Sequence, residues 1–309
     1  MTAPGHSTPA VIAPDRQKAG RTVTRSSAAR AFLRRFLRTR MTLAALIALA
    51  LLIFCAIFAK VIAPYNPVTD QAYAIANKGP MAGHLLGTDY LGRDILSRVI
   101  YGSRVSLLVG LIAVGIGLFV GVTIGVVAGY MGGALDAFLM RFTDAIWAFP
   151  ALILALAITS ALGRGIVNAM IAIGIVNIPF FARLSRASTL SVREQDFVTA
   201  ARALGASNGR IITRYVLPNI AAPIIVQGSL LFAVAITTEA ALSFLGVGVQ
   251  PPQPSWGLDL RYGYQYMEIN PILAFAPGIA IFITVLAFNF IGDGLRAALD
   301  PRLSRRGQD

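Results

Sequence analysis

The sequence predicts an all-α membrane protein that crosses the bilayer six times. Of its 309 residues, 56% are hydrophobic and only 13% are charged, which is too apolar for an ordinary soluble domain of this length. Several uncharged runs reach the ~20 residues that a helix needs to cross the hydrocarbon core. These runs are continuously apolar rather than alternating, so they favour helices over the strands of a barrel. The single cysteine, Cys55, lies in such a run, and an internal disulfide is excluded.

Two segments precede the first predicted span. Residues 1–28 are rich in Ala, Thr, Ser and Pro and are predicted to form a disordered cytoplasmic tail. In residues 29–40, Phe and Leu alternate with Arg so that a helix would carry them on opposite faces, which predicts an amphipathic helix at the membrane interface. A secretory signal is the alternative, but the basic region and the apolar run after it are both too long for one.

One membrane domain, residues 41–309, follows these segments. Its six predicted spans cover 41–59, 105–130, 145–162, 166–184, 220–245 and 271–291. The second span has four glycines spaced four residues apart, so that one helix face becomes a groove in which another helix can pack closely. These glycines are Gly117, Gly121, Gly125 and Gly129. Pro150 lies near the start of the third span, and Asn177 and Pro179 interrupt the apolar pattern of the fourth.

The placement of Lys and Arg predicts the orientation. Of the 27 basic residues, 20 fall on the side that holds both termini if the chain crosses six times, and 7 fall on the other side. The richer side is expected to be the cytoplasm, so both termini and the loop at 193–219 are predicted to be cytoplasmic in a multi-pass protein of the inner (plasma) membrane. This topology also accounts for the net charge of +13 without nucleic acid as a partner.

The polar stretch at 196–219 predicts a short helix–turn–helix between two spans. Asp196 is a favourable helix start, and 197–204 form about two turns. Gly205 follows where a left-handed residue most easily ends a helix.

A second helix completes this loop, capped by Ser207 or Asn208 and stopped by Pro218. The pair carries Arg202 and further arginines outside the membrane. The simplest interpretation is a loop made basic by topology alone; the alternative is a surface that contacts a partner.

Glu239 is the only acidic residue within a predicted span. It is interpreted either as a group lining a translocation path for an amine-bearing substrate or as a structural acid bonded to Thr237 or Ser243. Asn177 is the second candidate for the path. No enzyme or metal site is predicted, since the two histidines lie far apart and no phosphate-binding loop is present. If ATP drives this protein, the ATP and its Mg must bind to another chain.

The loop at 196–219 resembles the EAA loop of ATP-binding-cassette importer permeases. Ala200-Ala201, Gly205 and Leu217-Pro218 stand at that spacing, whereas Thr199 and Tyr215 depart from it. The resemblance implies that this loop couples the membrane domain to an ATPase. The residues to which that role is assigned are Phe197, Ala200, Ala201, Arg202, Leu204, Gly205, Leu217 and Pro218.

Three further stretches are similar to the "C" permease subunits of dipeptide, oligopeptide and nickel importers. They are HLLGTDYLGRDILSRVIYGSR at 84–104, ALSFLGVGVQPPQPSWG at 241–257 and AFNFIGDGLRAALDPRL at 287–303. The resemblance implies a type I importer fold and uptake of di- or oligopeptides by alternating access. The implied partners are a homologous second permease, two ATPase subunits and an extracytoplasmic peptide-binding protein, within membrane lipid.

Other functions were weighed against this interpretation. Nickel or another small solute is the alternative within the family. An ion-coupled transporter or channel would require several intramembrane charges, whereas this chain offers essentially Glu239, and it would be favoured by inverted repeats, of which the sequence shows none. A scaffold subunit without transport is compatible with the polar loop alone. The loop at 250–257, with its three prolines and Trp256, is expected to face outward and to suit docking of a binding protein.

Overall fold

The computed structural model describes residues 32–34, 36–37 and 39–299. The predicted tail at 1–28 lies outside the described residues, as do residues 300–309 and residues 29–31, 35 and 38 of the predicted interfacial helix. Where that segment is described, residues 32–34 and 36 are helical, and the rings of Phe32 and Phe36 stack with their centroids 5.9 Å apart.

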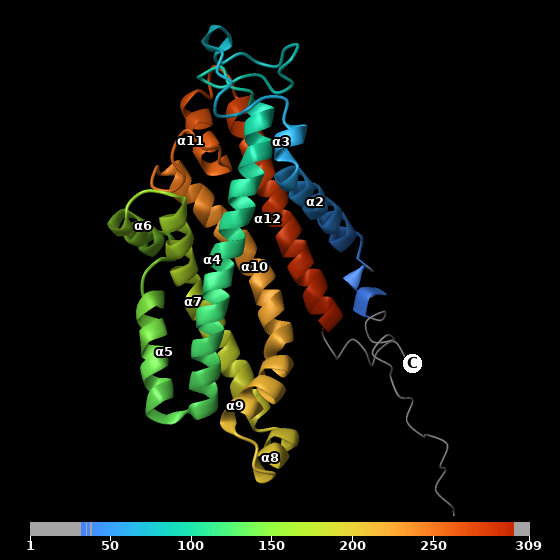
Figure 1. Cartoon of the computed structure of the whole chain (residues 1–309), viewed down its shortest axis with the longest axis vertical. Helices are drawn as coiled ribbons and strands as arrows, with labels where there is room; N and C mark the ends of the chain where they lie inside the picture. Colours follow the sequence, from blue (N-terminus) through green and yellow to red (C-terminus); the bar gives the residue numbers. More distant parts are fainter. Residues whose placement is uncertain (1–31, 35, 38, 300–309) are drawn as a thin grey trace, which may run out of the picture.

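The described chain is helical, with no named strand (Figure 1). The α-helices are α2 (Arg40–Ile57), α3 (Ala59–Ile62), α4 (Ile95–Met131), α5 (Gly133–Trp147), α6 (Ala151–Leu162), α7 (Ile166–Arg193), α8 (Asp196–Ala203), α9 (Asn208–Ile211), α10 (Leu217–Phe244), α11 (Trp256–Gln265) and α12 (Ile272–Leu299). A short 3₁₀ turn, Tyr73–Ile75, and a π-helical turn, Ile212–Val216, complete the order.

Five of these helical stretches are long and apolar enough to cross a membrane. They are α2, α4, α7, α12 and the continuous run Asn208–Phe244. A sixth crossing would need α5 and α6 to act together, although the pair is bent by 90°.

The third predicted span, 145–162, is therefore wrong as a straight helix. Helix α5 ends at Trp147 and α6 begins at Ala151, with Pro150 at the N-cap between them. Proline has no backbone N–H to continue a helix and favours the start of a new one, so the apolar run is divided at this point.

The fifth span also differs from the prediction, because Pro218 does not stop the preceding helix. Residues 208–244 continue through the π-helical turn at Ile212–Val216, and Pro218 lies in the first turn of α10. The proline ring would collide with the carbonyl four residues earlier in a regular α-helix, and an extra residue in the preceding turn relieves that crowding.

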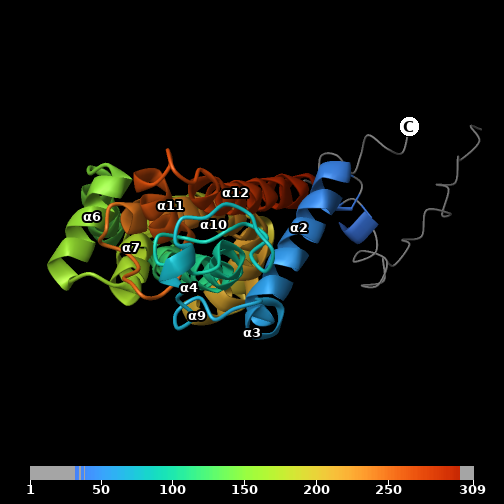
Figure 2. The same cartoon turned by 90° about the horizontal axis from the view of Figure 1, so that it is seen from above.

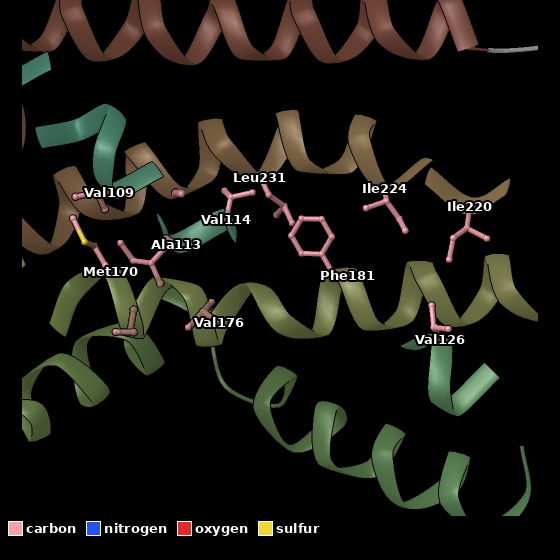
Figure 3. Close-up of a cluster of buried hydrophobic side chains, with 14 of the residues drawn as sticks. Val109, Ala113, Val114, Val126, Met170, Val176, Phe181, Ile220, Ile224 and Leu231 are labelled. Atoms are coloured by element: carbon pink, nitrogen blue, oxygen red, sulfur yellow. The ribbon is translucent and has the colours of Figure 1, made fainter. Parts of the chain in front are cut away.

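Helices α4, α7 and α10 form the centre of the molecule (Figures 1 and 2). Helices α2 and α12 pack on one side of this centre, and α5 and α6 lie against α7 on the other. Most of the core side chains come from the three central helices, and Phe181 of α7 points toward Leu231 of α10 (Figure 3). The loop before α4 and helix α11 close one end, while α8 and α9 lie at the opposite end (Figure 1).

The four glycines that are spaced four residues apart on α4 all face α7, which passes close to them. They are Gly117, Gly121, Gly125 and Gly129. A Cβ atom on Gly121 would stand 2.6 Å from the carbonyl oxygen of Ile178, and one on Gly129 would stand 2.8 Å from that of Arg186. Gly117 faces Asn177 in the same way. Removing the Cβ lets the two backbones approach, and close approach is how membrane helices gain packing energy.

A substitution on this face should separate the two helices. Gly121→Leu places a side chain where the α7 backbone lies, and we expect the purified protein to lose thermal stability in detergent and to aggregate on size exclusion. Gly115→Leu is the matched control, because a Cβ at Gly115 of the same helix meets no heavy atom within 4 Å. Equal melting temperatures for the two variants would contradict this packing role.

Candidate functional site

Helix α8 and the turn after it form the first candidate site. The helix lies beyond the ends of the long helices (Figure 1) and places Val198 and Ala201 against the bundle, where both are buried. Its other side carries Phe197, which is 43% exposed, and Leu204 at its C-cap is 88% exposed. Arg202 is exposed as well. An exposed leucine and phenylalanine beside an arginine are typical of a protein-binding surface.

The turn out of α8 has the geometry that the sequence predicted. Gly205 has φ = +80°, and its N–H donates to the Arg202 carbonyl at 3.0 Å. The N–H of Ala206 donates to the Ala201 carbonyl at 3.1 Å, so the two bonds form a Schellman motif. A Cβ at Gly205 would meet no heavy atom within 4 Å, so the requirement for glycine comes from the backbone angle alone.

Two of the coupling residues are placed differently from the expectation. Ala201 faces the chain's own bundle, so it lets α8 lie close to the bundle, while Ala200 remains exposed on the other side. Leu217 packs against the central core, and Pro218 is exposed on the first turn of α10. Of the predicted set, Phe197, Ala200, Arg202, Leu204 and Gly205 therefore lie on the exposed part of α8 and its turn, and Pro218 is exposed on α10.

The loop is anchored to the long helices. Tyr130, near the end of α4, donates its hydroxyl to Asn208 Oδ1 at 3.1 Å. Val198 and Ile211 both belong to the central hydrophobic cluster and have no exposed surface. The loop thus has a fixed inner side and an open outer side.

Glu239 is fully buried between α4 and α10. Ser243 donates its hydroxyl to Oε1 at 2.8 Å, and Ser106 of α4 donates to Oε2 at 3.2 Å. Thr237 donates to the carbonyl of Ala233 instead. The carboxyl group therefore links two helices, as in the structural interpretation of this residue.

Asn177, the other candidate for the path, is also buried. It is 1% exposed and packs against Gly117. Among the described residues its Nδ2 has no hydrogen-bond partner. Neither Glu239 nor Asn177 has a surface that a passing solute can reach in this conformation.

A buried network of charges holds the end opposite α8. Arg93 donates Nε to Asp89 Oδ2 at 2.7 Å, and Arg98 of α4 donates Nε to Asp259 Oδ1 of α11 at 2.8 Å. Arg98 also donates to the carbonyl of Pro67 at 3.2 Å. The charged side chains are at most 6% exposed. Opposite charges that pair with good geometry can remain buried, and together they fix α11 on α4.

Aromatic rings cover this network. The ring of Tyr90 lies 4.5 Å from that of Tyr262 and 5.6 Å from that of Tyr266, centroid to centroid. Burial raises the pKa of Tyr90 to about 12, so its hydroxyl remains protonated at neutral pH.

The same end contains the loop that was expected to dock a binding protein, and Trp256 does not fit that role. Its side chain is 1% exposed, lies against Gly102 and donates Nε1 to the carbonyl of Val99 at 2.9 Å. It anchors α11 instead.

Asp94 caps α4 by accepting from Ser97 N at 2.7 Å, and its other carboxyl oxygen lies 3.0 Å from His84 Nδ1.

The ion pairs between α5 and α7 are not predicted from the sequence. Arg186 makes a two-pronged contact with Asp136, both N–O distances being 2.6 Å. Arg183 donates to Asp144 at 2.7 Å. The available signal is the two acids before the third span together with the arginines at the end of the fourth span and just after it, which enter the topology count only as positive charges.

Two family models match this chain. A family model described as "Binding-protein-dependent transport system inner membrane component" matches residues 121–305, and one described as "N-terminal TM domain of oligopeptide transport permease C" matches 27–80.

Individual proteins are similar over most of the chain. The "Glutathione transport system permease protein GsiD" of Shigella flexneri serotype 5b (strain 8401) is 48% identical over 272 residues, which cover 88% of this chain and 90% of that protein. The protein of the same description from Escherichia coli O157:H7 is 46% identical over the same coverage. Among solved structures, an inward-facing MetNI methionine ABC transporter matches with a TM-score of 0.56 at 18% identity, covering 67% of this chain and 98% of that one, and so shows a shared fold.

Removing one partner from the buried charge network should destabilise the protein. Arg98→Gln leaves the Asp259 carboxylate buried without its cation, which typically costs about 3–5 kcal/mol. We expect a clear fall in the melting temperature measured in detergent. Arg98→Gln combined with Asp259→Asn should recover part of the loss, because no unpaired charge then remains. A double variant less stable than Arg98→Gln would contradict the pairing.

Proposed function

Because this chain belongs to the family of binding-protein-dependent transport system inner membrane components, we propose that it is one permease of an ATP-driven importer of short peptides. It pairs with a homologous second permease, two ATPase subunits that bind ATP and Mg, and an extracytoplasmic peptide-binding protein. Substrate passes between the two permeases by alternating access, driven by ATP binding in the partner subunits.

The relatives support short peptides as the substrate class. Those at 46–48% identity are described as glutathione transport permeases, and glutathione is a tripeptide. The second family match is described as part of an oligopeptide permease. Glutathione is therefore the first solute to test, in vesicles that contain the complete complex and its loaded binding protein. A complex that takes up nickel but neither glutathione nor other short peptides would contradict the proposal.

The two-sided geometry of α8 is the observation that carries the coupling role. The outer side presents Phe197, Arg202 and Leu204 to a partner, while the inner side is buried against the bundle. Only Glu194 and Gln195 separate α8 from the end of α7. A force applied to the outer side is thus transmitted to α7 and, through the glycine contacts, to α4. We propose that α8 lies in a groove of an ATPase subunit.

This role requires the α8 end of the molecule to lie in the cytoplasm. In a Cys55-free background, Ser207→Cys should react with a membrane-impermeant thiol reagent only from the cytoplasmic side, because Ser207 is exposed beside α8. Ser255 is unsuitable for the opposite side, since it is fully buried and caps α11 through Leu258 N. Gln253→Cys is exposed and should react only from outside. Labelling of both from one side would refute the topology.

Gly205→Val should uncouple the permease from its ATPase. A β-branched residue at φ = +80° is strained by about 1–3 kcal/mol, so the turn after α8 should rearrange and displace Leu204. We expect normal membrane insertion but loss of both uptake and the ATP hydrolysis that loaded binding protein stimulates.

Gly209→Val is the matched control for this experiment. Gly209 lies four residues further in α9, has no positive φ and has the same open space around its Cβ position. It should retain stimulated hydrolysis. The coupling role is refuted if Gly205→Val keeps both hydrolysis and uptake at the level of the Gly209→Val control.

A further inference from the structure

Arg183 of α7 and Asp144 of α5 form an exposed ion pair. It lies at the level of the uncharged run of the neighbouring helix α4. The two side chains are 45% and 57% exposed, respectively. Ala182, next to Arg183, packs against Gly121 and Gly125, which lie inside the uncharged run 105–130. Charges at such depth are rare and almost always face the bundle interior or a water-filled cavity. This face of α7 is therefore expected to border water or a partner rather than lipid.

A cavity of about 240 Å³ lies beside the pair, at the break between α5 and α6. Its lining includes Trp147, Phe149 and Pro150 from the break and Val176, Pro179 and Phe180 from α7. Positions 176, 179, 180 and 183 follow the i, i+3, i+4, i+7 spacing, so the cavity wall and Arg183 share one face of α7. The volume is below the roughly 300–1,000 Å³ of a complete small-molecule site, as expected for one wall of a path shared with a second permease.

Trp147 and Asp144 hold the guanidinium of Arg183 in place. The guanidinium carbon lies 3.8 Å from the centroid of the Trp147 ring, and one amino nitrogen donates to Asp144 Oδ1 at 2.7 Å. A stacked guanidinium keeps its planar fork of N–H groups, which matches the two oxygens of a carboxylate. Nearly half of the Arg183 side chain is exposed, so donors remain for a second acceptor.

We infer that Arg183 binds a carboxylate of the short peptide as it moves along this wall, with the aromatic side chains of the cavity contacting its apolar part. This inference rests on the proposed peptide function. Asp144 acts as the resting partner, which keeps the cation in position and competes with the substrate. The site thereby replaces Glu239 and Asn177 as the part of this chain that meets the solute.

Equilibrium binding tests this site without the external binding protein. The complex of both permeases and both ATPases is placed in nanodiscs, and radiolabelled glutathione is the probe. Arg183→Gln should weaken binding about tenfold, since charge-assisted hydrogen bonds are lost. Arg183→Lys keeps the charge but not the fork and should weaken it less. Asp144→Asn should leave binding equal or tighter, because a competing acceptor is removed.

Arg183→Gln and Asp144→Asn are expected to affect glutathione binding differently. This difference separates a role in substrate binding from a purely structural role. If the pair only holds α5 on α7, Arg183→Gln and Asp144→Asn break it equally and should weaken binding equally, which would overturn the inference. Assembly on size exclusion and hydrolysis stimulated by loaded binding protein show whether each variant is intact; we expect Arg183→Gln to keep both while its uptake falls.

These experiments distinguish a wrong substrate site from a wrong proposed function. If the wild-type complex takes up glutathione but shows no binding in nanodiscs, or if Arg183→Gln binds as the wild type does, the site is wrong while the importer function stands. If the wild-type complex with its loaded binding protein takes up no peptide, the proposed function itself fails.

Discussion

The close contact between the backbones of α4 and α7 is the constraint on which the rest of the structure depends. Lipid chains are as apolar as leucine, so helices in a membrane associate through close packing rather than through the hydrophobic effect. At Gly125 a Cβ atom would overlap the carbonyl oxygen of Ala182 and the side chain of Ser185. Four such contacts over three helical turns fix α7 on α4 along its length. Everything attached to α7, including α8 at one end and α5 beside it, takes its position from this contact.

Features that depend on local chain chemistry were predictable from the sequence. The spacing of the glycines on α4 and the positive φ of Gly205 follow from helix geometry and from the absence of a Cβ, and the structure has both. Features that depend on contacts between distant segments were not. Pro150 is visible in the sequence, but the 90° bend between Trp147 and Ala151 is accompanied by ion pairs to α7 that join residues 39 and 50 positions apart. Pro218 predicts a helix stop only because the sequence alone does not show the π-helical turn before it.

The same dependence on contacts between distant segments explains why the sequence singles out Glu239 and Asn177 as candidates for the path. Glu239 and Asn177 stood out because polar residues are rare within apolar runs, yet burial is settled by partners elsewhere in the chain. Ser106 lies 133 positions before Glu239, and Gly117 lies 60 before Asn177. Arg183 gives a weaker signal for the converse reason: it stands at the end of the predicted span 166–184, where an arginine is expected from topology alone. Its depth becomes visible only when its neighbour Ala182 is seen against Gly121 and Gly125.

Helix α7 connects the two ends of the proposed mechanism. It packs on α4 through the glycine face, carries Arg183 on another face and continues almost directly into α8. A rigid helix fixed in this way transmits a displacement at its α8 end with little loss, whereas a loosely packed helix would absorb it by sliding or bending. The tight glycine contacts and the ion pairs to α5 make α4, α5 and α7 one body. Movement of α8 by an ATPase would then carry Arg183 and the aromatic cavity with it, so that a single motion changes the wall that the substrate meets.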